Sequence, residues 1–313
     1  MHRRTLLKSV AAGSTLALPT VALAQDDATP AAGDSPLAAT LVDSGYAPVN
    51  GLEIYYEIHG QGEGTPLLAL HGSYMSIDSM LQIISPLAAT RTVIAFEAQG
   101  HGRTADIVDR QITYESLADD AAGVLDHLGI QQADVFGYSM GGNTAIQVAI
   151  RHPEKVRKLV PTSCTFRLDG WDPRVRELIA TITPEVFAGT PFEAEYLRLA
   201  PNPENWPVLV EKLVALDTTV PQDIPVETLQ AIAAPALVAA GDQDSVTPTH
   251  VVEMFLALGG GTPGDLGLPA PKAWLAIFPN TTHISVMFVP DQLLATIPPF
   301  LDAPLPGAAT PVA

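Results

Sequence analysis

The stretch that decides the fold runs from residue 133 to residue 143 and reads Ala-Asp-Val-Phe-Gly-Tyr-Ser-Met-Gly-Gly-Asn. Its first four residues predict a buried strand, and a helical pattern continues from Asn143 to Arg151. Between them lies Ser139 in the order Gly-x-Ser-x-Gly, whose small neighbours allow a tight turn from strand to helix. Such a turn holds the hydroxyl clear of the backbone, beside the amide groups of a helix N-terminus. We therefore expect Ser139 to be a nucleophile.

A nucleophilic serine needs a general base, and His283 is the best placed of the eight histidines. It directly follows Pro279-Asn280-Thr281-Thr282, after the last predicted strand. In a parallel sheet this position lies at the carboxyl edge, where catalytic groups gather. Among the other histidines, we interpret His71 and His101 as structural residues of glycine-flanked loops. We interpret His59 and His127 as surface residues.

The base needs a carboxylate to orient it, and Gly241-Asp242-Gln243-Asp244 offers two, directly after a predicted strand. The chain order serine, aspartate, histidine is typical of one particular scaffold. Asp242 could instead close the turn, because aspartate side chains often bond to nearby backbone groups. We favour Asp244, and Asp242 stays as the alternative.

Short β-branched runs alternate with helical patterns along the middle of the chain, which predicts a mostly parallel sheet covered by helices. The expected strands cover residues 52–58, 67–70, 93–96, 133–136, 156–160, 236–239 and 273–278. The alternation stops between residues 165 and 230, where prolines separate short helical pieces that carry several aromatic residues. An insertion of this kind usually packs over the sheet as a cap.

Five motifs, in this order, resemble those of the α/β-hydrolase family over nearly all of residues 50–300. They are His71-Gly72-Ser73, Gly100-His101-Gly102-Arg103-Thr104, the Ser139 turn, the loop from Gly241 through Asp244 to Pro248, and His283. The resemblance implies an eight-stranded, mostly parallel sheet flanked by helices, with a helical cap. It also implies that Asp244 is the triad acid and that the backbone amides of Met140 and Ser73 form an oxyanion hole.

The chain departs from many relatives of that family before its Gly-His-Gly loop, where it has Glu97-Ala98-Gln99 instead of residues that include an aspartate. This departure leaves the subfamily and the local salt bridge open. A serine at position 139 argues against the dehalogenase and epoxide-hydrolase branches, which the resemblance associates with aspartate there. Carbon–carbon bond hydrolases and cofactor-free haloperoxidases share the serine triad and remain alternatives.

The ends of the chain differ in composition from its middle. Residues 1–24 combine Arg3-Arg4, an apolar run and Ala22-Leu23-Ala24, the pattern of a cleavable signal of the twin-arginine type. An uncleaved membrane anchor is the alternative. Residues 25–45 and 303–313 are expected to be a flexible linker and a flexible tail, so that the hydrolase domain covers residues 46–302.

Composition excludes several classes of protein. Hydrophobic residues make up 47% of the chain and charged residues 16%, which argues against disorder. The formal charge of −18 argues against a nucleic-acid-binding surface. The single cysteine, Cys164, excludes an intramolecular disulfide and a cysteine-based zinc site, and we interpret it as a small buried side chain. We expect neither a metal nor an organic cofactor, and no stable membrane insertion after signal cleavage. The oligomeric state is left open.

Together these features predict an exported serine hydrolase that cleaves a small carboxylic ester or lactone. Tyr74, Met75 and Tyr138, which flank the expected oxyanion and nucleophile positions, are expected to contact the substrate with the cap in a mostly apolar pocket. The alternatives are haloperoxidase or perhydrolase chemistry, carbon–carbon bond hydrolysis on the same triad, and a ligand-binding protein on a hydrolase scaffold.

Overall fold

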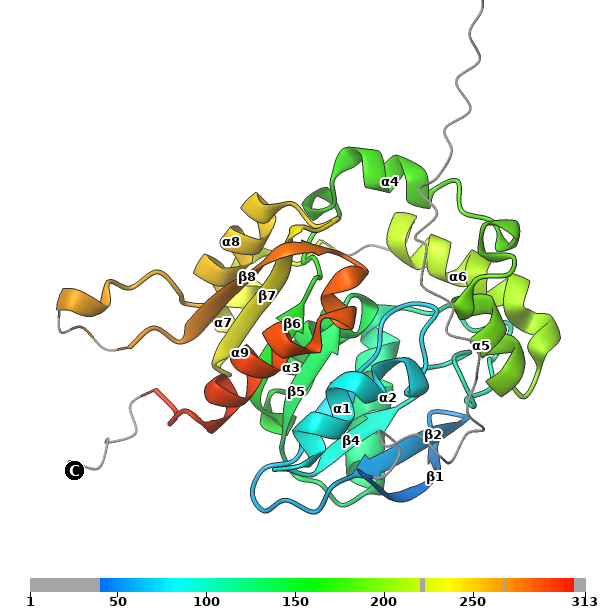
Figure 1. Ribbon diagram of the computed structural model, residues 1–313, viewed down its shortest axis with the longest axis horizontal. Helices are drawn as coiled ribbons and strands as arrows, with labels where there is room; N and C mark the ends of the chain where they lie inside the picture. The colour runs from blue at the N-terminus through cyan, green and yellow to red at the C-terminus, as the bar shows by residue number, and fades with distance from the viewer. Residues whose placement is uncertain (1–39, 220–222, 267, 269, 307–313) are drawn as a thin grey trace, which may run out of the picture. The chain divides into compact units, whose positions relative to one another are not determined.

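A computed structural model describes residues 40–219, 223–266, 268 and 270–306 (Figure 1). The expected signal (1–24), most of the expected linker and residues 307–313 of the tail lie outside these residues. The described chain builds one eight-stranded sheet in the order β1-β2-β4-β3-β5-β6-β7-β8. The strands are β1 (Leu41–Val49), β2 (Leu52–His59), β3 (Leu67–Leu70), β4 (Val93–Phe96), β5 (Ala133–Tyr138), β6 (Val156–Thr162), β7 (Ala236–Gln243) and β8 (Ala273–Thr282).

The sheet is parallel from β4 to β8, and β2 pairs antiparallel with both β1 and β4. All seven strands expected from the sequence are present, and several extend a few residues further. The long run of parallel strands confirms the predicted fold class. It also brings the carboxyl ends of β5, β7 and β8 to the same edge.

Strand β1 was not predicted, and it corrects the expected linker boundary at residue 45. Residues 41–45 pair with β2 and belong to the sheet. The pattern was hard to detect because the first four residues of β1 are exposed and include Asp43 and Ser44. An edge strand with few buried side chains lacks the apolar run that indicates a strand in sequence.

Helices cover both faces of the sheet (Figure 1). Buried side chains of α1 (Leu81–Ala88) and α9 (Pro290–Asp302) form one core with one face of the strands. Those of α2 (Tyr114–His127), α3 (Met140–Arg151) and α8 (Pro248–Ala257) form a second core with the other face. In β3, Leu67 and Ala69 enter the first core and Leu68 and Leu70 the second, as the alternation of a strand requires.

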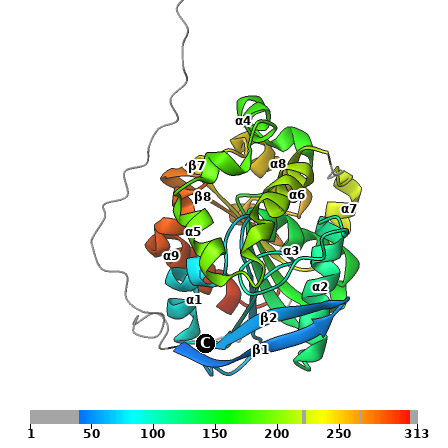
Figure 2. The same ribbon diagram turned by 90° about the vertical axis from the view of Figure 1, so that its right-hand side faces the viewer.

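Between β6 and β7 the chain leaves the sheet and forms a helical insertion. Its helices are α4 (Pro173–Ile179), α5 (Pro191–Leu199), α6 (Trp206–Thr218) and α7 (Val226–Ala231). Short helices begin here because prolines occupy first-turn positions in α4, α5 and α6, and the side chains of Asp172 and Thr190 cap α4 and α5. In Figure 2, α4, α5 and α6 lie together, with α5 next to α1 below them. The insertion agrees with the cap expected over residues 165–230.

Candidate active site

Ser139 lies at the turn between β5 and α3 with φ 53° and ψ −117°, a strained backbone conformation for a residue other than glycine. The turn is possible because its neighbours are small. A Cβ atom on Gly137 would lie 2.0 Å from the carbonyl oxygen of Gly141, and one on Gly141 would lie 2.2 Å from that of Leu70. Helix α3 begins at Met140, three residues earlier than its sequence pattern indicated. The expected nucleophile turn is therefore present.

His283 follows β8 and reaches Ser139 across the sheet edge. Its Nε2 atom lies 3.0 Å from the Oγ atom of Ser139, although 144 residues separate the two in sequence. Its Nδ1 atom lies 2.8 Å from Oδ1 of Asp244. A carboxylate only accepts hydrogen bonds, so Nδ1 carries the proton and Nε2 is left to accept one from the serine hydroxyl. The Tyr138 hydroxyl donates to the backbone carbonyl of His283 at 2.6 Å and holds this segment in place.

Asp244 is the carboxylate that the structure brings to His283. Its side chain is fully buried, and besides His283 it accepts hydrogen bonds from the Ser163 hydroxyl at 2.6 Å and the Val246 amide at 3.0 Å. Burial alone would raise the pKa of Asp244, but the hydrogen bonds and charge of His283, together with Ser163, outweigh burial and hold that pKa below its ordinary value. Asp244 is therefore held as an anion.

Asp242 has a different environment. It is exposed, and its Oδ1 atom accepts a hydrogen bond from the amide of Thr281 at 3.2 Å. This contact joins the ends of β7 and β8 and does not involve His283. Of the two aspartates that the sequence left open, Asp242 has the turn environment and Asp244 contacts the histidine.

The two residues expected to supply oxyanion amides are both found next to the serine's site, one along the chain and one in the cavity. Ser73 lines the same cavity as Ser139, in the loop of residues 71–77 that follows β3. Met140 is the first residue of α3, so its backbone amide lies at the helix N-terminus next to Ser139. Its side chain is buried in the core. Tyr74, next to Ser73, has φ 64° and shares the left-handed strain of the serine.

A cavity of about 250 Å³ opens over Ser139 and His283. The expected contact residues Tyr74, Met75 and Tyr138 all line it. The insertion covers it with six apolar side chains: Trp171, Val175, Ile179, Ile182, Phe187 and Phe192. Five further lining residues were not predicted from the sequence: Asp217, Ser245, Ile284, Met287 and Phe288. Three of them lie together in residues 284–288, directly after His283, and that position was the available signal. Asp217 and Ser245 lie in other segments, and their spacing carries no signal that they share this cavity.

Asp217 is the one carboxylate among the described lining residues, and these include neither lysine nor arginine. It lies on α6, and its Oδ1 atom accepts a hydrogen bond from the Tyr114 hydroxyl at 3.0 Å. Burial, and then the charge of Asp217, raise the pKa of Tyr74, so the carboxylate acts on the cavity wall next to Ser73. The cavity is thus mostly apolar with a local negative charge.

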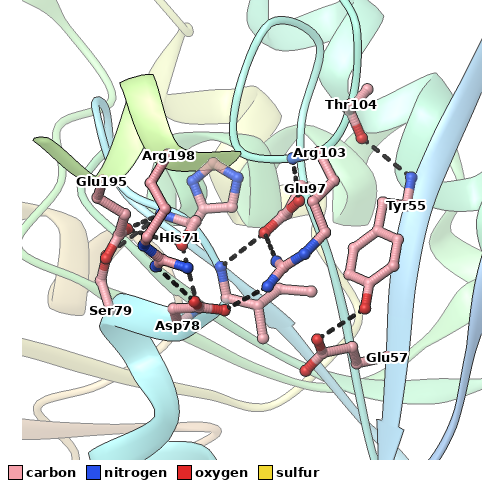
Figure 3. Close-up of polar contacts among 12 residues, drawn as sticks. Tyr55, Glu57, His71, Asp78, Ser79, Glu97, Arg103, Thr104, Glu195 and Arg198 are labelled. Atoms are coloured by element: carbon pink, nitrogen blue, oxygen red, sulfur yellow. Dashed lines mark hydrogen bonds and ion pairs between the residues drawn. The ribbon is translucent and has the colours of Figure 1, made fainter. Parts of the chain in front are cut away.

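The segment Glu97-Ala98-Gln99 takes part in an ion pair. Glu97 is buried, and its Oε1 atom lies 2.7 Å from Nη1 of Arg103. Figure 3 shows Arg103 between Glu97 and Asp78, whose Oδ1 atom lies 2.8 Å from Nη2. Burial raises the pKa of Glu97 to about 7, against the opposing effect of Arg103. A salt bridge therefore forms with glutamate as the acid.

Three further sequence interpretations can be compared with the structure. Cys164 is buried, and burial raises the pKa of its thiol. His71 and His101 are buried, with their Nδ1 atoms bonded to the carbonyls of Gly72 and Gln99, as structural residues would be. His59 was expected at the surface and is instead 1% exposed, because it pairs with Glu57 at 2.8 Å.

The described residues contain no helix with the length and apolar character needed to cross a bilayer. Their histidine, cysteine, aspartate and glutamate side chains likewise form no group of three or more that could hold a metal ion.

Comparison with known proteins places this arrangement in context. The family model of the alpha/beta hydrolase fold matches residues 65–175. A 2-hydroxymuconate semialdehyde hydrolase from Pseudomonas sp. (strain CF600) is 40% identical over 126 residues, which are 36% of this chain and 44% of that protein. RutD from Azorhizobium caulinodans, whose name proposes carbamate hydrolysis, is 32% identical over 230 residues, which are 66% of this chain and 83% of that protein.

The chain spans 44% of the length of the Pseudomonas sp. hydrolase and 37% of the length of a second 2-hydroxymuconate semialdehyde hydrolase, from Pseudomonas putida. Among solved structures, the enol-lactonase from Burkholderia xenovorans LB400 matches with a TM-score of 0.62 and 22% identity, over 82% of this chain and all of the other. That likeness concerns the fold. The sheet order, the serine turn after β5 and the relative matched over 83% of its length lead to one conclusion: this chain belongs to the alpha/beta hydrolase fold family.

Proposed function

We propose that this protein is an exported serine hydrolase that cleaves small, uncharged carboxylic esters or lactones. The observation that carries the proposal is the continuous hydrogen-bonded chain from Ser139 through His283 to Asp244. This chain opens on an apolar cavity, so an ester carbonyl can approach the serine hydroxyl away from bulk water.

The reaction follows from the protonation state of His283. As the Oγ atom of Ser139 attacks the carbonyl carbon, Nε2 of His283 removes the hydroxyl proton, and Asp244 stabilises the imidazolium. The tetrahedral intermediate collapses, the bond to the leaving oxygen breaks, and His283 returns the proton to it. His283 then activates a water molecule, which attacks the acyl-enzyme and releases the acid and Ser139.

The negative oxygen of the tetrahedral intermediate needs preorganised donors. We assign this role to the backbone amides of Ser73, which lines the cavity with Ser139, and of Met140, the residue after Ser139. Removing one such donor in other serine hydrolases costs about 10²- to 10³-fold in kcat. The position of the Ser73 amide is therefore expected to affect the rate strongly, although less than the loss of a triad residue.

The cavity favours a neutral substrate. Its apolar lining suits an alkyl or aryl group, and the Asp217 carboxylate would repel an anion. The net charge of −18 also disfavours the approach of an anionic substrate, over longer distances. The enol-lactonase among the structural neighbours supports lactones as one candidate substrate class.

A second candidate function is carbon–carbon bond hydrolysis, favoured by the 40% identity to a 2-hydroxymuconate semialdehyde hydrolase. Muconate derivatives are carboxylates, and a cavity that holds Asp217 without a lysine or arginine among the described lining residues is poorly suited to them. We therefore rank ester or lactone cleavage first.

Export is proposed from Arg3-Arg4 and Ala22-Leu23-Ala24. N-terminal sequencing of the protein from its native host should find a start near Gln25. Detection of intact Met1 in the cytoplasmic fraction would contradict export and leave the hydrolase proposal unaffected.

The hydrolase proposal is tested by covalent labelling followed by a substrate panel. A fluorophosphonate probe should label the wild type and not Ser139→Ala. The panel would compare p-nitrophenyl esters of increasing acyl length, neutral lactones, a muconate-type carbon–carbon substrate, and bromination with peroxide and acetate. Labelling with preferred turnover of an ester or lactone supports the proposal. A protein that binds these compounds without labelling or turnover would be a ligand-binding protein on a hydrolase scaffold.

A further inference from the structure

The loop that carries Ser73 is attached to the cap. This oxyanion loop, residues 71–77, leads into a short 3₁₀ helix at Asp78–Met80. Figure 3 shows Glu195 and Arg198 of α5 beside Ser79 and Asp78. The sequence separation is more than 100 residues, so this contact exists only through tertiary packing.

Glu195 makes the more specific of the two connections. One of its oxygens, Oε1, accepts three hydrogen bonds from the oxyanion loop and the 3₁₀ helix after it. The donors are the Ser76 amide at 3.2 Å, the Ser76 hydroxyl at 2.7 Å and the Ser79 hydroxyl at 2.5 Å. Ser76 is 1% exposed, so its amide has little access to water. The Ser76 amide also donates to the Ser79 hydroxyl at 3.3 Å, and that hydroxyl is itself bonded to Glu195. Without Glu195 this end of the loop would lose the acceptor that Ser76 and Ser79 share.

Arg198 makes a second connection one helical turn away. Its Nη2 atom lies 2.7 Å from Oδ2 of Asp78, and Asp78 also pairs with Arg103. Arg103 pairs in turn with the buried Glu97, which accepts a hydrogen bond from the Ile77 amide at 3.3 Å. The end of the loop is thus held from the cap on one side and from the sheet on the other.

The loop needs such support because its backbone is strained. Tyr74 adopts φ 64°, a conformation that is unfavourable for a residue with a side chain. Tyr74 lies between Ser73 and Ser76. A strained backbone conformation persists only where several surrounding contacts hold it in place. If the anchor at Ser76 were released, the loop could relax and carry the Ser73 amide away from the position of the oxyanion.

We propose that Glu195 is a positioning residue of the oxyanion hole: from the cap, it holds Ser76 and Ser79 and thereby fixes the Ser73 amide beside Ser139. The inference rests on the proposed function, since it assumes that the Ser73 amide stabilises an oxyanion. The insertion between β6 and β7 thus has a second role besides covering the cavity, since it holds the oxyanion loop through Glu195. A displacement of α5 that breaks the Glu195 contacts also loosens the oxyanion hole, so cap position and catalytic competence are coupled.

The test compares Glu195→Ala, Glu195→Gln and Glu177→Ala in the full chain. Glutamine keeps an oxygen that can accept from Ser76 and Ser79. Glu177 is an exposed carboxylate on α4, outside the described cavity lining, so its removal controls for loss of charge from the cap. All kinetic constants would be normalised to active sites titrated with the fluorophosphonate probe, which removes any effect of partial misfolding.

We expect Glu195→Ala to lower kcat about 10- to 100-fold, less than or equal to the loss of one oxyanion donor, with KM changed less than about threefold. Inhibition by a trifluoromethyl ketone, which forms a tetrahedral oxyanion on the serine, should weaken by the same factor. Glu195→Gln should stay within about threefold of the wild type because it keeps the acceptor. Glu177→Ala should match the wild type in both measurements.

Several outcomes would overturn the proposal. A wild-type kcat and inhibitor affinity per titrated site in Glu195→Ala would show that the loop does not depend on this contact. Equal losses in Glu195→Ala and Glu177→Ala would assign the effect to charge. If Glu195→Ala does not fold, Ser79→Ala is the second variant: it removes the hydrogen bond from Ser79 to Glu195 and the 3.3 Å bond that the Ser76 amide donates to the Ser79 hydroxyl. It should show a smaller parallel loss in kcat and inhibitor affinity, or the proposal fails. A wild type that is neither labelled nor active would refute the proposed function itself.

Discussion

The hydroxyl of Ser163 donates a 2.6 Å hydrogen bond to Oδ2 of Asp244, the carboxylate oxygen opposite the one that contacts His283. Ser163 follows β6 and has φ 51°, so the chain turns sharply to present this hydroxyl. The carboxylate is therefore held at both oxygens, and its plane is fixed relative to the imidazole ring.

Ser163→Ala should weaken this orientation without removing the carboxylate. We expect kcat to fall about 3- to 10-fold, which is less than the full contribution of a hydrogen bond to a charged group, because Asp244 keeps its contacts with His283 and the Val246 amide. Ser163→Thr keeps the hydroxyl and tests for rescue, although its branched side chain is disfavoured at positive φ. Unchanged steady-state kinetics in Ser163→Ala would show that the remaining donors suffice.

Asp244→Asn and Asp242→Asn should separate the two aspartates of one loop. Asparagine at 244 would favour the wrong histidine tautomer, and we expect kcat to fall about 10³- to 10⁴-fold. At 242 the change should leave kcat within about threefold and act mainly on stability, because Asp242 accepts from the Thr281 amide. Steady-state kinetics and thermal unfolding of both variants test this. An inactive Asp242 variant beside an active Asp244 variant would reverse the assignment.

Ser139 and His283 should behave as one unit. Each alanine variant should lose about 10⁴- to 10⁶-fold in kcat, and the double variant should lose little more, because both side chains serve the same proton transfer. The measurement is a double-mutant cycle with any ester that the wild type hydrolyses. Losses that multiply would mean that the two residues act in separate steps, which the 3.0 Å contact between them argues against.

Asp217 should set the charge preference of the cavity. Two esters that differ only by a terminal methyl or carboxylate group would be compared by kcat/KM. In Asp217→Asn the ratio of neutral to anionic ester should fall about tenfold or more, through improved use of the anion. Glu211→Gln is the matched control, because Glu211 is an exposed carboxylate on the same helix. A ratio that stays constant in Asp217→Asn would remove Asp217 from substrate selection.

Stability should fall as the pH decreases below about 6.5. Burial is the largest effect on three histidines and lowers the pKa of His71 to about 4, of His101 to about 3 and of His250 to about 4. The unfolded chain binds protons at these histidines below about pH 6.5, while the folded chain resists until its lower pKa, so acid favours unfolding. Each of these buried histidines should lower the free energy of unfolding by about 2 kcal/mol at pH 4.5 relative to neutral pH.

Urea unfolding at pH 7.5, 6 and 4.5 measures this dependence. The Phe166 amide donates a 3.1 Å hydrogen bond to Nε2 of His250, and the glutamine of His250→Gln keeps an acceptor for it. This variant should make the dependence of stability on pH shallower by about one proton. His127→Gln changes an exposed residue and should leave the slope unchanged. A wild type with constant stability from pH 7.5 to 4.5 would mean that these histidines are not buried as neutral groups in solution.

Local sequence determined the parts of this protein that depend on local constraints. A strand, a serine between glycines and a helix form one continuous segment, and the steric limits at Gly137 and Gly141 apply within a few residues. The seven predicted strands were readable for a similar reason, since each is an apolar run buried on both faces or on one. His283 could be chosen because it directly follows such a strand.

Tertiary structure decided the rest, because contacts between distant segments depend on how elements pack. Asp242 and Asp244 are two residues apart and chemically identical, and only the register of β7 against β8 turns one toward His283 and the other toward Thr281. Strand β1 is an exposed edge whose pairing with β2 carries little pattern of its own. Glu195 looks like any helix-surface glutamate in sequence, and it acquires its three donors only when α5 packs on a loop 119 residues earlier in the chain.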